Sequence, residues 1–156
     1  MAETGITACD YTNKAHRQAV ADMINAYIED EMGGGEILSK DRQLRLLDGL
    51  QGCSGAIVLL AEHANVYCGL LTAFEHFSTF TVQPMINIHD VIVLKAYRGK
   101  GIGRQLMNAV IAEAEKRLCS RLTLEVRQDN LVAQHLYREL GFHDTDPPMF
   151  YWRKYL

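Results

Sequence analysis

The sequence predicts an α/β fold in which helices flank a mixed central sheet, in the order β-α-α-β-β-β-α-β-α-β. Two observations support this prediction. Apolar residues recur at helical spacing in several stretches, and short stretches rich in β-branched and aromatic residues lie between them. A length of 156 residues suits one compact hydrophobic core, so we expect residues 1–156 to form a single domain.

The first part of the chain predicts a short strand followed by two helices. We expect the strand over residues 6–11 and the helices over residues 16–31 and 39–51. The run Gly33-Gly34-Gly35 should end the first helix, because glycine has a low helix propensity. Ser39 is a suitable N-cap for the second helix.

Three strands should follow. Residues 55–62 and 66–77 are rich in β-branched and aromatic residues, and the short connection at 63–65 predicts a hairpin. Residues 85–94 form a third long strand candidate, which Pro84 introduces. These strands would make the centre of the sheet.

The pattern changes to helical spacing after this strand. Residues 103–117 have apolar positions three and four residues apart, which predicts an amphipathic helix. Residues 122–126 alternate like a strand, and Asn130 is a suitable cap for a helix over 131–139. We expect residues 150–155 to close the chain as a last strand.

Composition excludes several classes of protein. Hydrophobic residues make up 48% and charged residues 22%, which is typical of a globular protein and not of a disordered or fibrous one. A net charge of -3 argues against a nucleic-acid partner. No stretch reaches the ~18 apolar residues that a membrane span needs, and the start resembles no signal peptide. We therefore expect a cytoplasmic protein without a membrane partner.

The cysteines give no sign of a metal site. None of them forms a Cys-x-x-Cys pair or a Cys/His cluster at ligand spacing, so we expect reduced thiols and no metal. The four positions are Cys9, Cys53, Cys68 and Cys119.

A glycine-rich turn lies between the third long strand and the amphipathic helix. Free backbone N–H groups and the positive end of the helix dipole meet at such a place, which favours a phosphate ligand. Glycines at 99, 101 and 103 permit close approach of an anion, and basic side chains add positive charge. We expect a pyrophosphate to bind the segment Arg98, Gly99, Lys100, Gly101, Ile102, Gly103 and Arg104.

Two familiar phosphate motifs do not fit this turn. The nucleotide P-loop requires Ser or Thr after Gly-Lys, whereas Gly101 follows Lys100. The dinucleotide fingerprint requires a glycine where Arg104 or Leu106 stands, which disfavours a nicotinamide oxidoreductase. A glycine-rich turn without any ligand remains the alternative on this segment alone.

With the residues around it, the turn resembles the GNAT superfamily of N-acetyltransferases. The family signature Arg/Gln-x-x-Gly-x-Gly/Ala is matched by Arg98, Gly101 and Gly103, and the resemblance covers residues 85–142. It implies a mostly antiparallel central sheet flanked by helices, an enzyme that uses acetyl-CoA as co-substrate, and a homodimer. The stretch HDVIV at residues 89–93 is most similar to the small-amine and polyamine branch.

The resemblance also assigns cofactor-binding residues. The backbone edge of Val91, Ile92 and Val93 would pair with the pantetheine arm like an added strand, and an N–H there would meet the oxyanion. Residues 98–104 would hold the pyrophosphate. Asn130 would make a polar contact to the cofactor.

Acetyl transfer to an amine needs a base and an acid, and two residues suit these roles. An amine with a pKa of ~10 must lose a proton, and His89 on the fourth strand is the best candidate base, with Asp90 or water as alternatives. Tyr137 lies on the same helical face as Asn130, and its phenol would protonate the leaving thiolate. The structural alternatives are a hydrogen-bonded strand histidine and a packing tyrosine. The family's fourth strand commonly carries a bulge, so we expect the alternation of side chains between the two faces to be interrupted there.

The acceptor site should come from the first two helices and the glycine run between them. This region contains Glu29, Asp30, Glu31 and Glu36, which would either attract a cationic amine or form a solvated helix end. The identity of the acceptor amine stays open. A dimer contact through residues 150–155 is an analogy with the family.

Overall fold

The computed structural model describes residues 3–156. Contacts within the chain divide it into two compact units, Met1–Glu125 and Val126–Leu156. The single domain expected over residues 1–156 stays a prediction, because this division neither requires nor excludes independent folding.

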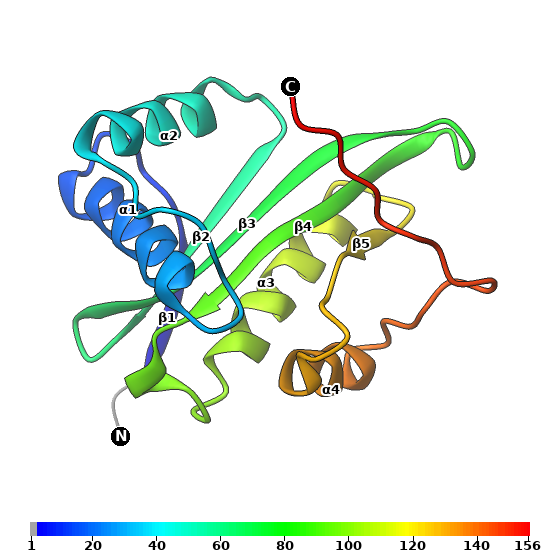
Figure 1. Cartoon of the computed structure of the whole chain (residues 1–156). Coiled ribbons are helices and arrows are strands. Elements are labelled where there is room, and N and C mark those ends of the chain that lie inside the picture. The colour runs from blue at the N-terminus through cyan, green and yellow to red at the C-terminus, as the bar shows by residue number, and fades with distance from the viewer. Residues whose placement is uncertain (1–2) are drawn as a thin grey trace. The chain divides into compact units, whose positions relative to one another are not determined.

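The larger unit contains a five-stranded sheet in the order β1-β2-β3-β4-β5 (Figure 1). Its first four strands are antiparallel neighbours, and β5 is parallel to β4. The prediction of a mixed, mostly antiparallel sheet is therefore confirmed. The strands are β1 (Thr4–Ala8), β2 (Ala56–His63), β3 (Val66–Ser78), β4 (Gln83–Val93) and β5 (Leu122–Leu124).

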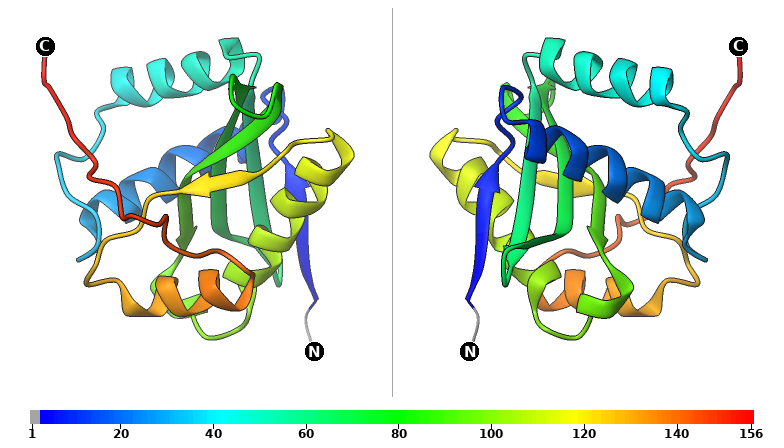
Figure 2. Two further views of the ribbon diagram at one scale, coloured as in Figure 1. Left: turned by 90° about the vertical axis from the view of Figure 1, so that its right-hand side faces the viewer. Right: turned by 90° about the vertical axis from the view of Figure 1, so that its left-hand side faces the viewer.

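Helices cover both faces of this sheet. Figure 2 shows α1 (Lys14–Glu29) and α2 (Lys40–Gly52) on one face and α3 (Ile102–Lys116) on the other. A short 3-10 helix, η1 (Lys95–Tyr97), follows β4. The Ser39 side chain accepts the N–H of Arg42 and caps α2, as predicted.

The start of α1 differs from its prediction by two residues. Asn13 is the N-cap, and its side chain accepts the N–H groups of Ala15 and His16. Asparagine is among the best N-cap residues, so a helix that begins at residue 14 could have been predicted from the sequence.

Each face of the sheet contributes to the core. Gly69 of β3 lies so close to α3 that a Cβ there would be 3.1–3.2 Å from Ile102 and Leu106. The opposite face packs against α1 and α2 through a cluster of buried residues, which comprises Ala19, Val20, Met23, Leu47, Leu50, Val58, Leu60, Leu70 and Ile92.

The smaller unit contains one helix, α4 (Leu131–Glu139), with the bounds that the sequence predicts. Asn130 caps it by accepting the N–H of Ala133 at 3.1 Å.

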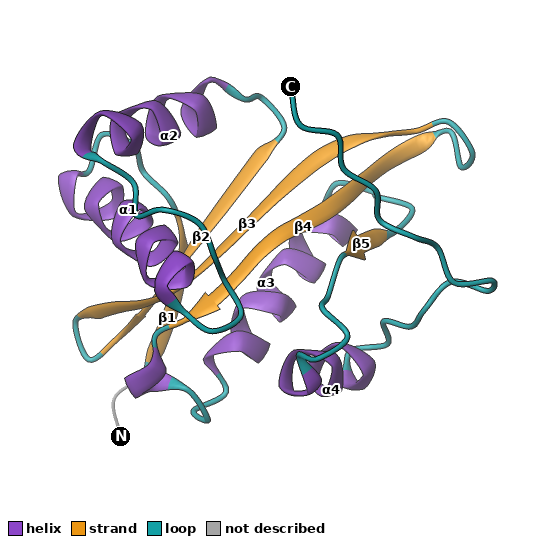
Figure 3. Cartoon of the chain, in the orientation of Figure 1, coloured by secondary structure: helices purple, strands orange, loops and turns teal. Residues whose placement is uncertain are grey.

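The predicted last strand over residues 150–155 is wrong, because these residues form a loop (Figure 3). Their aromatic residues are typical of a strand, but a strand needs a second backbone to satisfy its N–H and C=O groups. Val126–Leu156 contains no strand among its described residues, so it offers no such partner within its own unit. The observed sheet therefore has one strand fewer than predicted.

Candidate functional site

A β-bulge in β4 places the candidate base. The pairing of β3 with β4 passes from Thr72 opposite Asp90 to Ala73 opposite Ile88, so His89 is the extra residue. Such a bulge breaks the alternation of side chains between the two faces. The irregularity that we expected in the fourth strand therefore falls at the candidate base itself.

The two candidate bases have different surroundings. The His89 ring is exposed and meets the Phe74 ring edge-on, with centroids 4.9 Å apart. The Asp90 carboxylate accepts a hydrogen bond from the hydroxyl of Thr72, which is 2% exposed. His89 therefore presents an imidazole to solvent, whereas one Asp90 oxygen is already engaged.

The edge of β4 is open beyond this bulge. Among the described residues, β5 pairs with β4 only between Ile86 and Ile88. Leu94 donates its N–H to the Cys68 carbonyl of β3 at 2.9 Å. Because successive residues of a strand direct their N–H and C=O groups to opposite edges, Ile92 also faces β3, and Val91 and Val93 face the open edge.

The glycine-rich turn, residues 98–104, follows this open edge and leads into α3. Gly99 and Gly101 have φ values of 77° and 76°, in the left-handed region that favours glycine. Gly101 is the N-cap of α3 and has no side chain to occupy the first N–H groups of the helix. The turn therefore offers backbone donors at the positive end of the helix dipole.

Two basic side chains of the turn contact other parts of the larger unit. The Arg98 guanidinium donates through Nε to the Val93 carbonyl at 3.0 Å and through Nη2 to the Asp30 carboxylate. The Lys100 ammonium lies 5.0 Å from the centre of the Tyr97 ring. Arg98 is thus bonded within the protein, although the resemblance gives it a phosphate ligand.

Asp30 is the partner that sequence analysis did not find. It is the C-cap of α1, and the pKa of its carboxyl is lowered, first by the hydrogen bond from Arg98 and then by the N–H of Met32. The two charged residues are 68 positions apart, so no spacing in the sequence joins them. The carboxylate is not a solvated helix end.

The remaining two predicted site residues lie in the smaller unit. The Asn130 side-chain oxygen accepts the N–H of Ala133, so its amide nitrogen is the group left for a ligand. The half-buried Tyr137 ring is tilted toward Phe142, with centroids 6.1 Å apart. The larger unit contains the other predicted residues.

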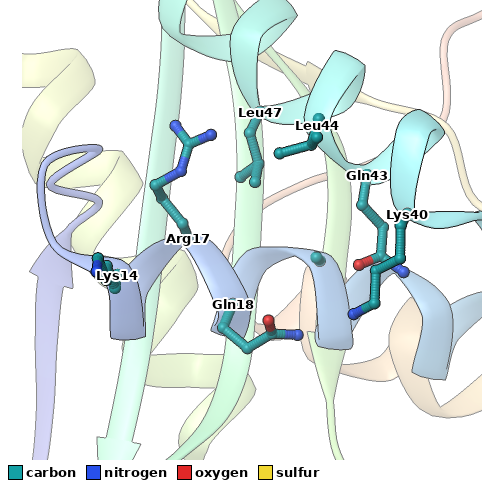
Figure 4. A pocket seen from close by; sticks show the side chains of 8 residues that line it. Lys14, Arg17, Gln18, Lys40, Gln43, Leu44 and Leu47 are labelled. Carbon is teal, nitrogen blue, oxygen red and sulfur yellow. The ribbon is translucent and has the colours of Figure 1, made fainter.

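A hollow of about 260 Å³ lies between α1 and α2 (Figure 4). Two of its polar side chains have partners nearby: Arg17 of α1 pairs with Asp48 of α2 at 3.7 Å, and Gln43 donates to the Leu38 carbonyl at 2.8 Å. This hollow lies between the two helices expected to contribute to the acceptor site, and neither the glycine run at 33–35 nor the glycine-rich turn at 98–104 lines it. Its lining consists of Lys14, Arg17, Gln18, Ala21, Lys40, Gln43, Leu44 and Leu47.

Three further features bear on cofactors and surroundings. Within residues 3–156, no three His, Cys, Asp or Glu side chains gather as a metal ion would require. The four cysteines are free thiols. No helix of the described chain is both long and apolar enough to cross a membrane.

Comparisons with known proteins identify the family of this chain. The family model described as Acetyltransferase (GNAT) family matches residues 20–142. A streptothricin acetyltransferase of Streptomyces lavendulae is 39% identical over 74 residues, which cover 47% of this chain and 39% of that protein. The ribosomal protein bS18-alanine N-acetyltransferase of Escherichia coli strain K12 is 40% identical over 77 residues, which cover 49% of this chain and 51% of that protein.

A solved structure shows the same fold over nearly the whole chain. An aminoglycoside N-acetyltransferase in complex with CoA has a TM-score of 0.76, covers 99% of this chain and 97% of its own, and is 18% identical. At that identity the likeness concerns the fold. The matched chain spans about half or less of the two curated relatives.

The family match includes the residues that the geometry brings together. It extends over the bulge in β4, the open edge, the glycine-rich turn and α3, and it covers well over half of the chain. The chain belongs to the GNAT family of acetyltransferases.

Proposed function

We propose that this protein transfers an acetyl group from acetyl-CoA to a primary amine by direct attack on the thioester. One observation supports this proposal above the others. The open β4 edge at Val91 and Val93 is followed, after the short helix η1, by the glycine-rich turn that begins α3. A pantetheine arm needs such an edge for its amides, and a pyrophosphate needs such a turn.

The cofactor would bind mainly through the backbone. Val91 would exchange hydrogen bonds with the pantetheine amides, as an added strand does, and Val93 would offer its N–H, because its carbonyl already accepts from Arg98. Ile92 would not donate to the cofactor, because its N–H faces β3. It would only connect Val91 and Val93 along the strand. The N–H groups of residues 99–104 would hold the pyrophosphate, with Lys100 and Arg104 adding positive charge. The Asn130 amide nitrogen would add one polar contact.

The reaction then needs two proton movements. The lone pair of the amine attacks the carbonyl carbon, and the amine proton passes to His89 or to water at the bulge. The N–H of Val91 or Val93 would donate to the oxyanion of the tetrahedral intermediate. The C–S bond breaks with its electron pair on sulfur, and the Tyr137 phenol protonates the thiolate.

The acceptor is proposed as a small amine. The relatives include enzymes named for streptothricin and for aminoglycosides, which are amine-bearing small molecules, and one named for a ribosomal protein. The stretch HDVIV at residues 89–93 favours the small-amine branch within this set. The acceptor would reach the acetyl group from the side of α1 and α2.

Two further properties follow from the family resemblance. We propose a homodimer, for which exposed aromatic residues such as Phe150 and Trp152 offer apolar contact surface. We also propose a cytoplasmic location, with which free thiols are compatible. Sedimentation analysis of the purified chain tests the first, and a monomer at micromolar concentration would contradict it.

Cofactor binding is the first test of the proposal. Ligands that bind the native state raise the midpoint of thermal unfolding. We expect acetyl-CoA and CoA to raise it and NADH to leave it unchanged. Stabilisation by NADH alone would favour an oxidoreductase, whereas acetyl-CoA binding without turnover of any amine would favour a CoA-binding sensor module.

A further inference from the structure

We propose that Asp30 is a positioning residue for the acceptor amine, because it fastens the loop between α1 and α2 to the glycine-rich turn through Arg98. This loop, residues 30–39, is called the acceptor loop below. The inference rests on the proposed function and names a residue that controls one substrate of that site.

The Asp30–Arg98 pair joins three segments of the larger unit: the acceptor loop, the glycine-rich turn and the end of β4. One Asp30 oxygen accepts the N–H of Met32 at 3.0 Å, and the other binds the Arg98 guanidinium. Arg98 also donates to the Val93 carbonyl at the end of β4. The acceptor loop is therefore tied to the end of the strand that would carry the acetyl group.

The first turn of the acceptor loop is fitted closely to α1. A Cβ at Gly33 would lie 1.7 Å from the Tyr27 carbonyl oxygen, so only glycine fits there. The Tyr27 hydroxyl donates to the Met32 carbonyl at 3.3 Å. These contacts set residues 30–33 against the helix end, and the ion pair fixes that turn relative to β4.

The next residues of the acceptor loop are glycines, whose backbone is less restrained than that of other residues. Gly34 and Gly35 have φ values of 147° and 102°, which few other residues adopt. The loop regains a side-chain bond at Leu38, whose N–H donates to Asn25 at 2.8 Å. The Asp30–Arg98 pair is thus the tie on the β4 side of a glycine-rich segment.

The ion pair is suited to a positioning role because it is partly shielded. The Asp30 side chain is 18% exposed and the Arg98 side chain 50% exposed. Two Arg98 nitrogens are used within the protein, which leaves the backbone N–H groups of the turn as the main donors to a pyrophosphate. Loss of the Asp30 charge should therefore disturb the acceptor loop more than the cofactor.

The consequence is a difference between the two substrates. Misplacement of a bound reactant by about 1 Å can lower a rate by about 100-fold. For Asp30→Asn, which keeps the shape and removes the charge, we expect kcat/KM for the amine to fall about tenfold. The Kd of acetyl-CoA should stay within about twofold of the wild-type value. Asp30→Glu, which keeps the charge, should recover part of the loss.

The decisive experiment is a double-mutant cycle with steady-state kinetics. Asp30→Asn and Arg98→Gln should impair use of the amine, and the double variant should be no worse than Arg98→Gln alone, since both remove one tie. Glu75→Gln is the matched control. It breaks the Glu75–Arg117 ion pair of 2.8 Å, which also joins two distant elements, and it should leave both substrates unaffected.

Different results would contradict the positioning role, the proposed function and the ion pair's effect on the loop. Unchanged kcat/KM for the amine in Asp30→Asn, or an equal loss of acetyl-CoA affinity, would overturn the positioning role. A wild-type protein that turns over no amine would contradict the proposed function and this role with it. Hydrogen exchange of residues 31–38 tests separately whether the Asp30–Arg98 ion pair holds the acceptor loop. Exchange should be faster in Asp30→Asn than in wild type and unchanged in Glu75→Gln. Equal exchange rates in Asp30→Asn and wild type would show that the ion pair does not hold the loop.

Discussion

Replacement of Gly101 by alanine tests whether the glycine-rich turn needs its left-handed backbone. Gly101 has φ 76° and ψ 6°, and a Cβ there would meet no atom within 4 Å. The change therefore adds no clash, and its cost comes from the backbone alone. A non-glycine residue in this region costs about 1–2 kcal/mol, of which alanine regains about 0.4–1 kcal/mol by restricting the unfolded chain.

The expected net loss is about 1 kcal/mol in the free energy of unfolding, which for a chain of this size lowers Tm by about 2–4 °C. Urea denaturation measures the first quantity and a thermal scan the second. Acetyl-CoA should also bind more weakly, because the altered turn redirects the N–H groups at the start of α3. Gly101→Asn should lie between wild type and alanine, since asparagine tolerates this region better.

Gly49→Ala is the matched control, because it makes the same chemical change within α2. A Cβ at Gly49 also meets no atom within 4 Å, and Gly49 lies inside the helix α2. Alanine should stabilise the protein there by about 0.5–1 kcal/mol. Equal effects of the two substitutions, or a Gly101→Ala variant as stable as wild type, would refute the argument from backbone conformation.

Three further predictions concern the core, pH and the acid. Leu106→Ala should cost about 2–5 kcal/mol in urea denaturation, because Leu106 is fully buried between α3 and the sheet. Leu131→Ala should change stability by less than about 0.5 kcal/mol, because Leu131 is 69% exposed. Similar losses of stability at both sites would show that burial does not determine the cost of these substitutions. Since Arg98 and the Met32 N–H lower the pKa of Asp30 below its ordinary 3.8, the stability that Asp30 contributes is present above that value and is lost as pH falls through the lowered native pKa. The difference in unfolding free energy between wild type and Asp30→Asn should therefore be constant near neutrality and shrink as pH falls below the ordinary 3.8, and a difference that does not change with pH in the acid range would contradict the cause given. Tyr137→Phe should lower kcat and leave the Kd of acetyl-CoA unchanged, whereas a parallel loss of both would argue against the phenol as acid.

The helices were the most readable part of the sequence. Ser39 and Asn130 cap the helices that they were expected to cap, and residues 131–139 form α4 with the predicted bounds. Local signals suffice here, because a helix satisfies its own backbone and a cap is a contact between near neighbours.

Features that depend on distant partners were less readable. Residues 150–155 have the composition of a strand, but only a second backbone could make them one. Similarly, the choice between Val91 and Ile92 at the open edge depends on which edge β3 occupies. The Asp30–Arg98 pair is a third example, since its partners meet only after the sheet has formed.

The sequence predicted the segments of the site better than the contacts between their side chains. The glycine-rich turn was recognised from its position between a strand and a helix, and the structure gives Gly99 and Gly101 the left-handed backbone that such a turn needs. The role of Arg98 was assigned by resemblance, and the structure gives that side chain two partners within the protein. Whether it also touches a phosphate stays a prediction.

The most direct test of the central proposal is amine-dependent release of free thiol from acetyl-CoA by the purified protein, with the acetylated product identified by mass spectrometry. A panel should include aminoglycosides, streptothricin, polyamines and an alanine-ended peptide. We predict thiol release that requires both the protein and a small amine, with one acetyl group on the product nitrogen. Absence of release with every amine, from protein that acetyl-CoA stabilises, would contradict acetyl transfer as its function.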